Sequence, residues 1–260
     1  MNYPGIRQAT AWSAAVAQRF EAKYRVSAAQ AHAIREHIRP FVNPDAHGRE
    51  YPVTSIYLDS PDLALYWSSA RGEERRRKLR IRTYAGNRSH CFFEVKHRFN
   101  QIVKKDRAVV RRSAADSVLA GNLILPEIFE DHGRDGENLH EFQDLVMSYR
   151  AAPKVVVRYM REAYVGKMDE PLRITFDSEL TCLPSHRFDP DAWEASPYWF
   201  EAPGSPIVLE VKFTDTFPIW VEDLVRRLDL LRDSFSKYVI CVDALREEGV
   251  DVARLERSGH

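Results

Sequence analysis

The chain of 260 residues carries 38 basic and 38 acidic side chains, so its formal net charge is zero. This balance excludes a chain-wide electrostatic attraction to nucleic acid or anionic membrane, and any anion site must arise from a local segregation of charge. The three cysteines lack CxxC spacing, so we expect no disulfide framework. No run of about 18 apolar residues predicts a membrane-spanning helix, and no signal peptide is predicted. These features together predict a cytoplasmic location.

Short strands with helices between them are predicted along the chain. Alternating apolar and polar residues predict strands, whereas apolar residues spaced by three and four predict helices. Residues 75–78 (RRRK), 132–138 and 183–206 are expected to form loops. In chain order we expect a strand at 20–26, a helix at 28–39 behind a Ser27 N-cap, a strand at 54–59, a helix at 62–71, strands at 79–84, 91–98 and 102–111, helices at 126–131 and 140–149, strands at 154–165, 172–180 and 207–214, a helix at 218–231, and a strand at 238–243.

Nine strands separated mostly by turns and short helices predict an α+β, mainly β fold. The expected architecture is an antiparallel β-barrel, closed or nearly closed, with flanking helices and a charged interior. The length fits a single domain, which we expect at 19–245 between an N-terminal segment at 1–18 and a tail at 246–260.

Charged residues recur at every second position of most predicted strands, which puts them on one face of each strand. An ordinary half-buried strand mixes both signs with small uncharged residues on its polar face. If the faces converge inside a barrel, nine basic side chains meet four acidic ones. The groups are Glu21 with Lys23, Arg80 with Arg82, Glu94 with Lys96, Lys105 with Arg107, Tyr159 with Arg161, Arg173 with Thr175 and Asp177, and Glu210 with Lys212.

Like charges confined in a poorly screened space repel one another, so this pattern predicts a site for a polyanion. Arg binds phosphate oxygens in a bidentate manner, and Lys supplies compact positive charge. The few carboxylates then need a divalent cation between them and the phosphates, and Mg²⁺ or Mn²⁺ takes such oxygen ligands. The alternative is a sheet with one wet, charged face. His90, His97 and His186 lack ligand spacing, and we expect them to be structural.

Nine segments of the sequence run in a recognisable order: RFEAKYRV, TSIYLDSPDLALYWSSARG, KLRIRTYAG, FFEVKHR, IVKKDR, VVRYMREAY, LRITFDSEL, IVLEVKF and DSFSKYVICV. In this order and spacing, from Arg19 to Asp243, they resemble the VTC domain. This is the polyphosphate polymerase domain of the vacuolar transporter chaperone complex, within the triphosphate tunnel metalloenzyme superfamily.

The resemblance implies a metal-dependent enzyme that transfers the γ-phosphoryl group of ATP to a growing polyphosphate chain inside a basic tunnel, with Mn²⁺ or Mg²⁺ as cofactor. It implies metal binding by Glu210, and Glu94 is the candidate for a second metal ligand or for orienting water. The expected catalytic residues are Lys23, Arg80, Arg82, Lys96, Arg161, Lys212 and Lys237, and the expected phosphate-binding residues are Arg71, Lys105, Arg107, Tyr159, Arg173 and Ser236.

The ExExK signature of the superfamily's first strand is represented only by Arg19, Glu21 and Lys23, which favours a polymerase. Hydrolysis of tripolyphosphate or of a nucleoside triphosphate is the alternative activity, and a non-catalytic sensor of polyphosphate or inositol phosphates is the alternative from another class. We expect ATP and polyphosphate as partners and no nucleic acid. The sequence has neither the phosphate-sensing domain nor the membrane helices of the eukaryotic complex, so a membrane-protein partner and the oligomeric state are left open.

Overall fold

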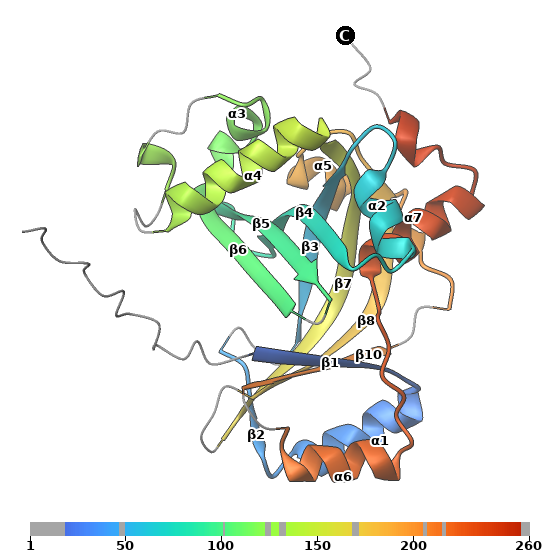
Figure 1. Cartoon of the computed structure of the whole chain (residues 1–260). Coiled ribbons are helices and arrows are strands. Elements are labelled where there is room, and N and C mark those ends of the chain that lie inside the picture. The colour runs from blue at the N-terminus through green and yellow to red at the C-terminus, as the bar shows by residue number, and fades with distance from the viewer. Residues whose placement is uncertain are drawn as a thin grey trace, which may run out of the picture.

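The computed structural model of the chain describes a strongly curled antiparallel sheet with helices on both of its faces (Figure 1). Because β-strands twist, a long sheet bends round and encloses one of its own faces. The described residues are 19–255, apart from 47–49, 101, 123–125, 130–133, 168–171, 205–206 and 215–216.

Eight strands form the continuous sheet in the order β1-β10-β8-β7-β3-β4-β5-β6, and every pairing is antiparallel. The short β2 pairs with β7, and β9 pairs with β8. No strand pairing among the described residues joins β1 to β6, so the sheet is a half-barrel. The strands are β1 (Arg19–Val26), β2 (Val42–Pro44), β3 (Glu50–Asp59), β4 (Arg75–Tyr84), β5 (His90–Phe99), β6 (Ile102–Arg111), β7 (Ala152–Gly166), β8 (Arg173–Pro184), β9 (Phe200–Glu201) and β10 (Ile207–Thr214).

Two apolar cores cover the outer face of the sheet and a third fills part of its inner face. One outer core joins β3 to β6 with α4 and α5, and the other joins β1, β8 and β10 with α1 and α6. The third holds the apolar side of α7 against β7 and β8. The helices are α1 (Ala28–Ile38), α2 (Ala64–Ala70), α3 (Ala115–Leu119), α4 (Asp135–Tyr149), α5 (Pro190–Ala195), α6 (Ile219–Arg227) and α7 (Lys237–Glu247).

The mainly β fold with flanking helices is confirmed, as is the Ser27 cap, whose side chain accepts a hydrogen bond from the backbone of Gln30. The predicted strand at 238–243 is wrong, because this segment belongs to α7. The predicted loop at 75–78 is also wrong, since β4 begins at Arg75. Successive side chains at the start of β4 point alternately to solvent and to the inner face of the sheet. A strand can therefore accommodate four basic residues in a row.

Two other predicted loops contain regular structure. Helix α4 begins at Asp135, inside the segment 132–138, of which 132 and 133 lie outside the described residues. The segment 183–206 holds α5 and β9. At the other end of the chain, α7 extends to Glu247 and Val252 is buried against it, so ordered structure continues past residue 245. In the described part of the chain, no helix combines the length and the apolar character needed to cross a membrane.

Candidate functional site

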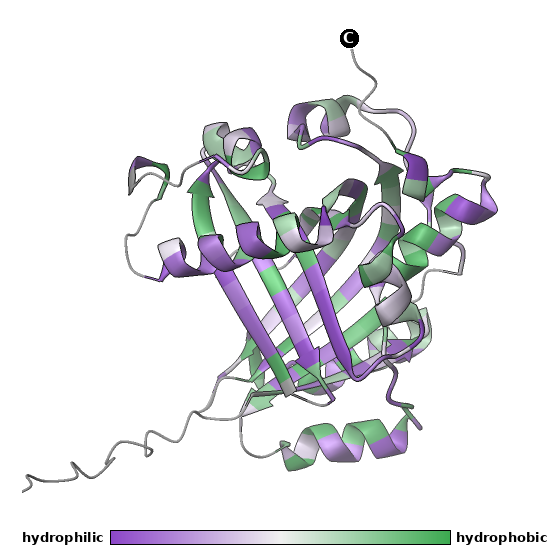
Figure 2. Ribbon diagram, turned by 45° about the horizontal axis from the view of Figure 1, so that its top comes forward, coloured by the Kyte–Doolittle hydropathy of each residue, from purple (hydrophilic) through white to green (hydrophobic). Residues whose placement is uncertain are grey.

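Hydrophilic residues, purple in Figure 2, lie along the strands as well as in the loops. The register explains where they gather. Arg80 is directly opposite Glu94, and Lys78 is directly opposite Lys96, on the face of β4 and β5 that lies away from the outer core. Most of the predicted residues share this inner face. The inner-face cluster comprises Glu21, Lys23, Lys78, Arg80, Arg82, Glu94, Lys96, Lys105, Arg107, Arg161, Asp177, Glu210, Lys212 and Lys237.

Glu94 anchors the part of the cluster on β4, β5 and β6. Its side chain is 1% exposed, and Arg80 Nη2 lies 2.7 Å from Oε2. Lys105 Nζ and Arg107 Nη2 lie 2.5 and 2.6 Å from Oε1. Burial favours the neutral acid, but Arg80 and Arg82 hold the pKa of Glu94 well below its usual range. Both oxygens of this buried carboxylate are therefore already bound by cations.

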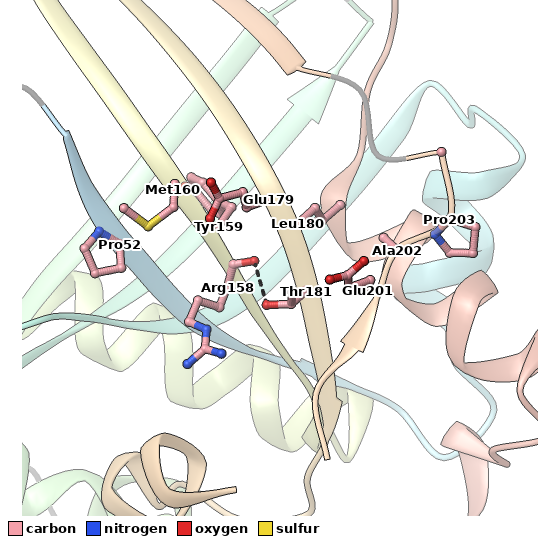
Figure 3. Close-up of a pocket in the computed structure, with 11 residues that line it drawn as sticks. Pro52, Arg158, Tyr159, Met160, Glu179, Leu180, Thr181, Glu201, Ala202 and Pro203 are labelled. Atoms are coloured by element: carbon pink, nitrogen blue, oxygen red, sulfur yellow. Dashed lines mark hydrogen bonds between the residues drawn. The ribbon is translucent and has the colours of Figure 1, made fainter. Parts of the chain in front are cut away.

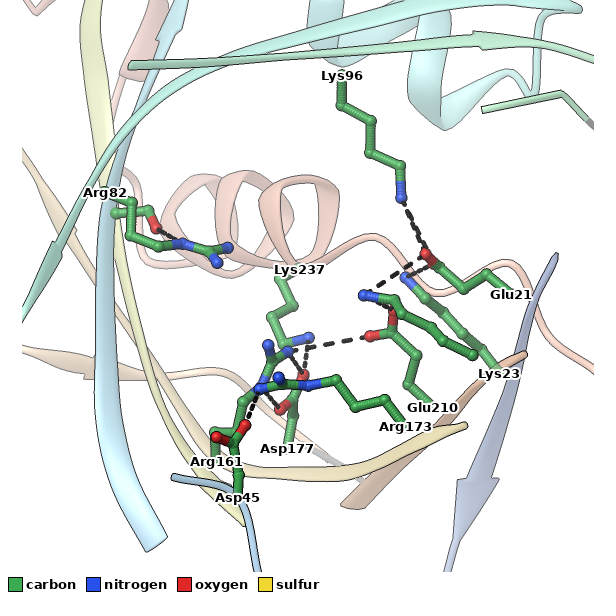
Figure 4. Close-up of polar contacts among 12 residues, drawn as sticks. Glu21, Lys23, Asp45, Arg82, Lys96, Arg161, Arg173, Asp177, Glu210 and Lys237 are labelled. Carbon is green, nitrogen blue, oxygen red and sulfur yellow. Dashed lines mark hydrogen bonds and ion pairs between the residues drawn. The ribbon is translucent and has the colours of Figure 1, made fainter. Parts of the chain in front are cut away.

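A second group joins β1 to β10 and reaches across to β5 (Figure 4). Lys23 Nζ lies 3.0 Å from Glu21 Oε1, and Lys96 Nζ lies 3.4 Å from the same oxygen. Lys212 Nζ lies 2.8 Å from Glu210 Oε1. Although burial opposes it, Lys23 and Lys212 hold the pKa of Glu210 well below its ordinary value. Side chains of the edge strand β1 thus meet β5 across the interior of the half-barrel.

A third group lies on β7, β8 and the first turn of α7. Arg161 donates two hydrogen bonds of 2.7 Å to Asp177, and Lys237 Nζ donates one of 2.6 Å to the same carboxylate. The Lys237 ammonium group also lies 4.5 Å from the centre of the Tyr159 ring. Arg173 is bound to Asp45, which comes after β2. Each of these predicted residues is therefore held in place by a named partner.

Lys78 belongs to this site, although the RRRK run that contains it was predicted to be a loop. Its Nζ donates a hydrogen bond of 2.7 Å to Ser236 Oγ, the N-cap of α7. Burial, together with the charges of Lys23 and Lys96, brings the pKa of Lys78 well below its ordinary value. The signal was present in the sequence, because Lys78 continues the two-residue spacing of Arg80 and Arg82 toward the start of the strand.

Arg71 is a predicted residue that lies apart from the inner-face cluster. Its side chain is 64% exposed at the end of α2 and pairs with Glu73. A pocket of about 810 Å³ also lies apart from it, beside the bulge of β7 and β8 and next to β9 (Figure 3). Of the predicted site residues, only Tyr159 lines this pocket. The predicted chemistry is therefore concentrated on the inner face.

The arrangement of Glu21 and Glu210 suits a divalent cation. Glu21 stands opposite Lys212 and Glu210 opposite Lys23 in the register of β1 and β10, so the two carboxylates are diagonal neighbours. Glu210 repels the charge on Glu21. The Thr175 hydroxyl, directly opposite Glu210 on β8, is buried without a hydrogen-bond partner among the described residues. Oxygen donors of this kind fit Mg²⁺ or Mn²⁺.

Comparison with known proteins identifies a family, and the solved structures that match include two of low sequence identity. A family model described as the VTC domain matches residues 18–246. A putative adenylyl cyclase from Hippeastrum, described as having a dominant triphosphatase activity, matches with 15% identity and a TM-score of 0.48 over 87% of this chain and 96% of that chain. A protein from Pyrococcus horikoshii OT3 matches with 13% identity and a TM-score of 0.45 over 86% of this chain and 98% of that chain.

Proposed function

Because the chain belongs to the VTC domain family, we propose that it is a metal-dependent polyphosphate polymerase that transfers the γ-phosphoryl group of ATP to a growing polyphosphate chain. The observation that carries the proposal is the excess of Lys and Arg over carboxylates in the inner-face cluster. Cations that are close together and only partly neutralised by acidic neighbours favour a ligand with several negative charges. A chain of phosphates supplies such charges at regular intervals.

In the proposed reaction, basic side chains on opposite walls of the half-barrel hold the triphosphate extended. A terminal oxygen of the polyphosphate attacks the γ-phosphorus, the bond from that phosphorus to the β,γ-bridging oxygen breaks, and ADP leaves with the electron pair. Arg161 and Lys237 are kept rigid by Asp177, which limits the reorganisation needed to bind a phosphoryl group. The attacking oxygen is already ionised, so no general base is required.

We propose that Glu210 and Glu21 hold the metal ion, with the Thr175 hydroxyl beside them. When bound, Mn²⁺ or Mg²⁺ would neutralise negative charge on the phosphate oxygens. A short lysine contact reaches one oxygen of each carboxylate, at 2.8 Å for Glu210 Oε1 and 3.0 Å for Glu21 Oε1. The other oxygens have longer contacts, 3.9 Å from Arg161 Nη2 to Glu210 Oε2 and 3.5 Å from Lys96 Nζ to Glu21 Oε2, which leaves them available to a metal ion. Glu94 is instead proposed as a buried anchor, since cations already contact both of its oxygens.

Hydrolysis of the triphosphate is the second candidate, because a neutral lysine can accept a proton from water. Burial lowers the pKa of Lys105 to about 7, so a substantial fraction is neutral near that pH. A bound polyanion favours the charged ammonium group and raises this pKa again. The base would then be lost just when substrate is present, which favours phosphoryl transfer to phosphate over transfer to water.

Incubation of the purified chain with ATP and Mn²⁺ tests the proposal through its products. We expect ADP and a long phosphate polymer, resolved by gel electrophoresis and by ³¹P NMR as a growing signal from internal phosphates. ADP with free phosphate and no polymer would identify a hydrolase. Tight polyphosphate binding without any nucleotide turnover would identify a non-catalytic sensor.

Binding of tripolyphosphate is expected to weaken as the pH rises. Burial lowers the pKa of Lys96 to about 8, so this side chain loses its charge between pH 7 and pH 9 in the free protein. A ligand that requires the charged form then loses affinity by roughly tenfold through Lys96 alone. Calorimetry should show net proton uptake on binding at pH 8. The variant Lys96→Arg stays charged and provides the matched control, because the ionisation of tripolyphosphate itself is the same in both titrations. Equal pH profiles in the two proteins would contradict the role of Lys96.

A further inference from the structure

A group of metal-ligand side chains lies on the outer face of the sheet, separate from the inner-face cluster. It consists of His97 on β5, Asp106 on β6 and Glu141 on α4. One ligand atom from each lies within 4.8 Å of the other two. His97 Nε2 lies 3.0 Å from Glu141 Oε1 and 3.5 Å from Asp106 Oδ2.

The strand register explains why these side chains meet. Side chains alternate between the two faces of a strand, so His97 and Asp106 point outward next to the inward-facing Lys96 and Lys105. His97 is directly opposite Lys104, which makes Asp106 its diagonal neighbour. Helix α4 packs on the same outer face through Phe142, whose ring contacts that of Phe93 edge to face. This contact brings Glu141, the preceding residue, to the two strands.

The distances suit a tetrahedral ion. Metal bonds of about 2.0–2.2 Å to nitrogen and oxygen separate neighbouring ligand atoms by roughly 3.3–3.6 Å. Of the two separations from His97 Nε2, that of 3.5 Å to Asp106 lies within this range and that of 3.0 Å to Glu141 lies just below it. The His97 Nε2 atom is buried and makes no hydrogen bond to any described residue, despite its closeness to Glu141. A buried ring nitrogen without a hydrogen-bond partner beside two carboxylates is suited to bind a metal ion.

The charge of the group also leaves room for a cation. With a neutral imidazole, the two carboxylates and Lys104 together carry one negative charge. Lys104 Nζ lies 3.0 Å from Asp106 Oδ2 and 3.6 Å from Glu141 Oε2. Its side chain is 65% exposed, so it can swing into solvent when an ion binds. Lys104 thus competes with a metal for the same oxygens.

We propose that His97, Asp106 and Glu141 bind a divalent transition-metal ion of the Zn²⁺ type that fastens α4 to β5 and β6. The mixed nitrogen and oxygen donors match this class of ion better than Mg²⁺ or Ca²⁺, which take oxygen ligands. Three protein ligands leave one position for water. The bound ion fixes the two strands whose opposite face carries Lys96, Lys105 and Glu94. The site is separate from the metal proposed for phosphoryl transfer, and its existence does not depend on the proposed activity.

Metal content measured after incubation with Zn²⁺ and gel filtration tests the site. The full-length Glu210→Gln variant serves as the background, because it removes a proposed ligand of the inner-face ion. We expect this variant to retain about one Zn²⁺ per chain that is lost on adding His97→Ala. Co²⁺ in place of Zn²⁺ should give visible absorption bands that disappear with the same substitution. Glu141→Gln, on the exposed side of the group, should weaken Zn²⁺ binding while leaving the fold intact.

The exposed His140 provides the matched control, since His140→Ala alters the same helix beside the site and should retain the ion. Lys104→Met should bind Zn²⁺ more tightly, because it removes the competing ammonium group. Zn²⁺ should also raise the Tm of the background variant and slow hydrogen exchange in α4. Equal metal content with and without His97, or no retained Zn²⁺ in the background variant, would overturn the proposal and leave His97, Lys104, Asp106 and Glu141 as an ion-pair network.

Discussion

Replacement of Glu94 by Gln is expected to destabilise the protein by about 3–5 kcal/mol, because it removes one partner from a buried group of charges. Arg80, Lys105 and Arg107 would then face one another without the carboxylate that they contact at 2.5 to 2.7 Å. The amide of Gln is similar in size to the carboxylate and creates no cavity, so the change in the free energy of unfolding arises from the lost charge. Urea unfolding followed by circular dichroism measures the change.

The ligand provides an internal check on this prediction. Tripolyphosphate supplies the missing negative charge, so it should stabilise Glu94→Gln more than it stabilises the unmodified protein. Glu222→Gln is the surface control, because its pair with Arg226 is exposed and contributes less than about 0.5 kcal/mol. A Glu94→Gln protein of normal stability that has lost metal-dependent turnover would restore Glu94 as a metal ligand.

Much of the inner-face cluster could be predicted from the sequence, because side-chain alternation is a property of every strand. Arg80 with Arg82, and Glu210 with Lys212, needed only the period of two to be assigned to one face. The signs of the charges then indicated a polyanion. No contact between strands was needed for this step, so the prediction did not depend on their order in the sheet.

The partners of these residues could not be predicted in the same way. Glu21 lies on β1 and Lys96 on β5, and they meet only because the sheet curls until its first and seventh strands face each other. Glu94 illustrates the consequence. As an isolated carboxylate among basic residues it suggested a metal ligand, whereas the register gives it Arg80 on one side and Arg107 on the other.

Helix α7 shows a limit of pattern reading in short apolar segments. Val239, Ile240 and Val242 favour a strand by their β-branched side chains. The helical spacing of Tyr238, Cys241 and Leu245, all buried, identifies the face that packs inside the half-barrel. Ser236, the N-cap directly before this segment, was the local signal that favours a helix over a strand here.

Replacement of Glu210 by Gln is expected to reduce polymer synthesis by at least about a hundredfold, on the scale of losing one group that stabilises the transition state. The substitution removes a proposed metal ligand but no phosphate contact. Glu210 lies among Lys23, Lys212 and Arg161, so loss of its charge makes the surroundings more positive. Binding of tripolyphosphate in the presence of EDTA should therefore be unchanged or tighter. Initial rates with ATP and Mn²⁺, together with calorimetry in EDTA, measure the two effects separately.

Arg80→Ala provides the opposite pattern, because it removes a proposed phosphate contact. Binding should weaken both with and without metal. The two variants also separate a metal ligand from a structural anion. If Glu210→Gln lost metal-free binding to the same extent as Arg80→Ala, Glu210 would be positioning the neighbouring cations, which is the role proposed for Glu94. If it kept metal-free binding but its rate became independent of Mn²⁺ concentration, the carboxylate would be the group through which the ion acts. Only the second pattern is consistent with a site in which Lys and Arg bind the substrate and Glu210 recruits the metal.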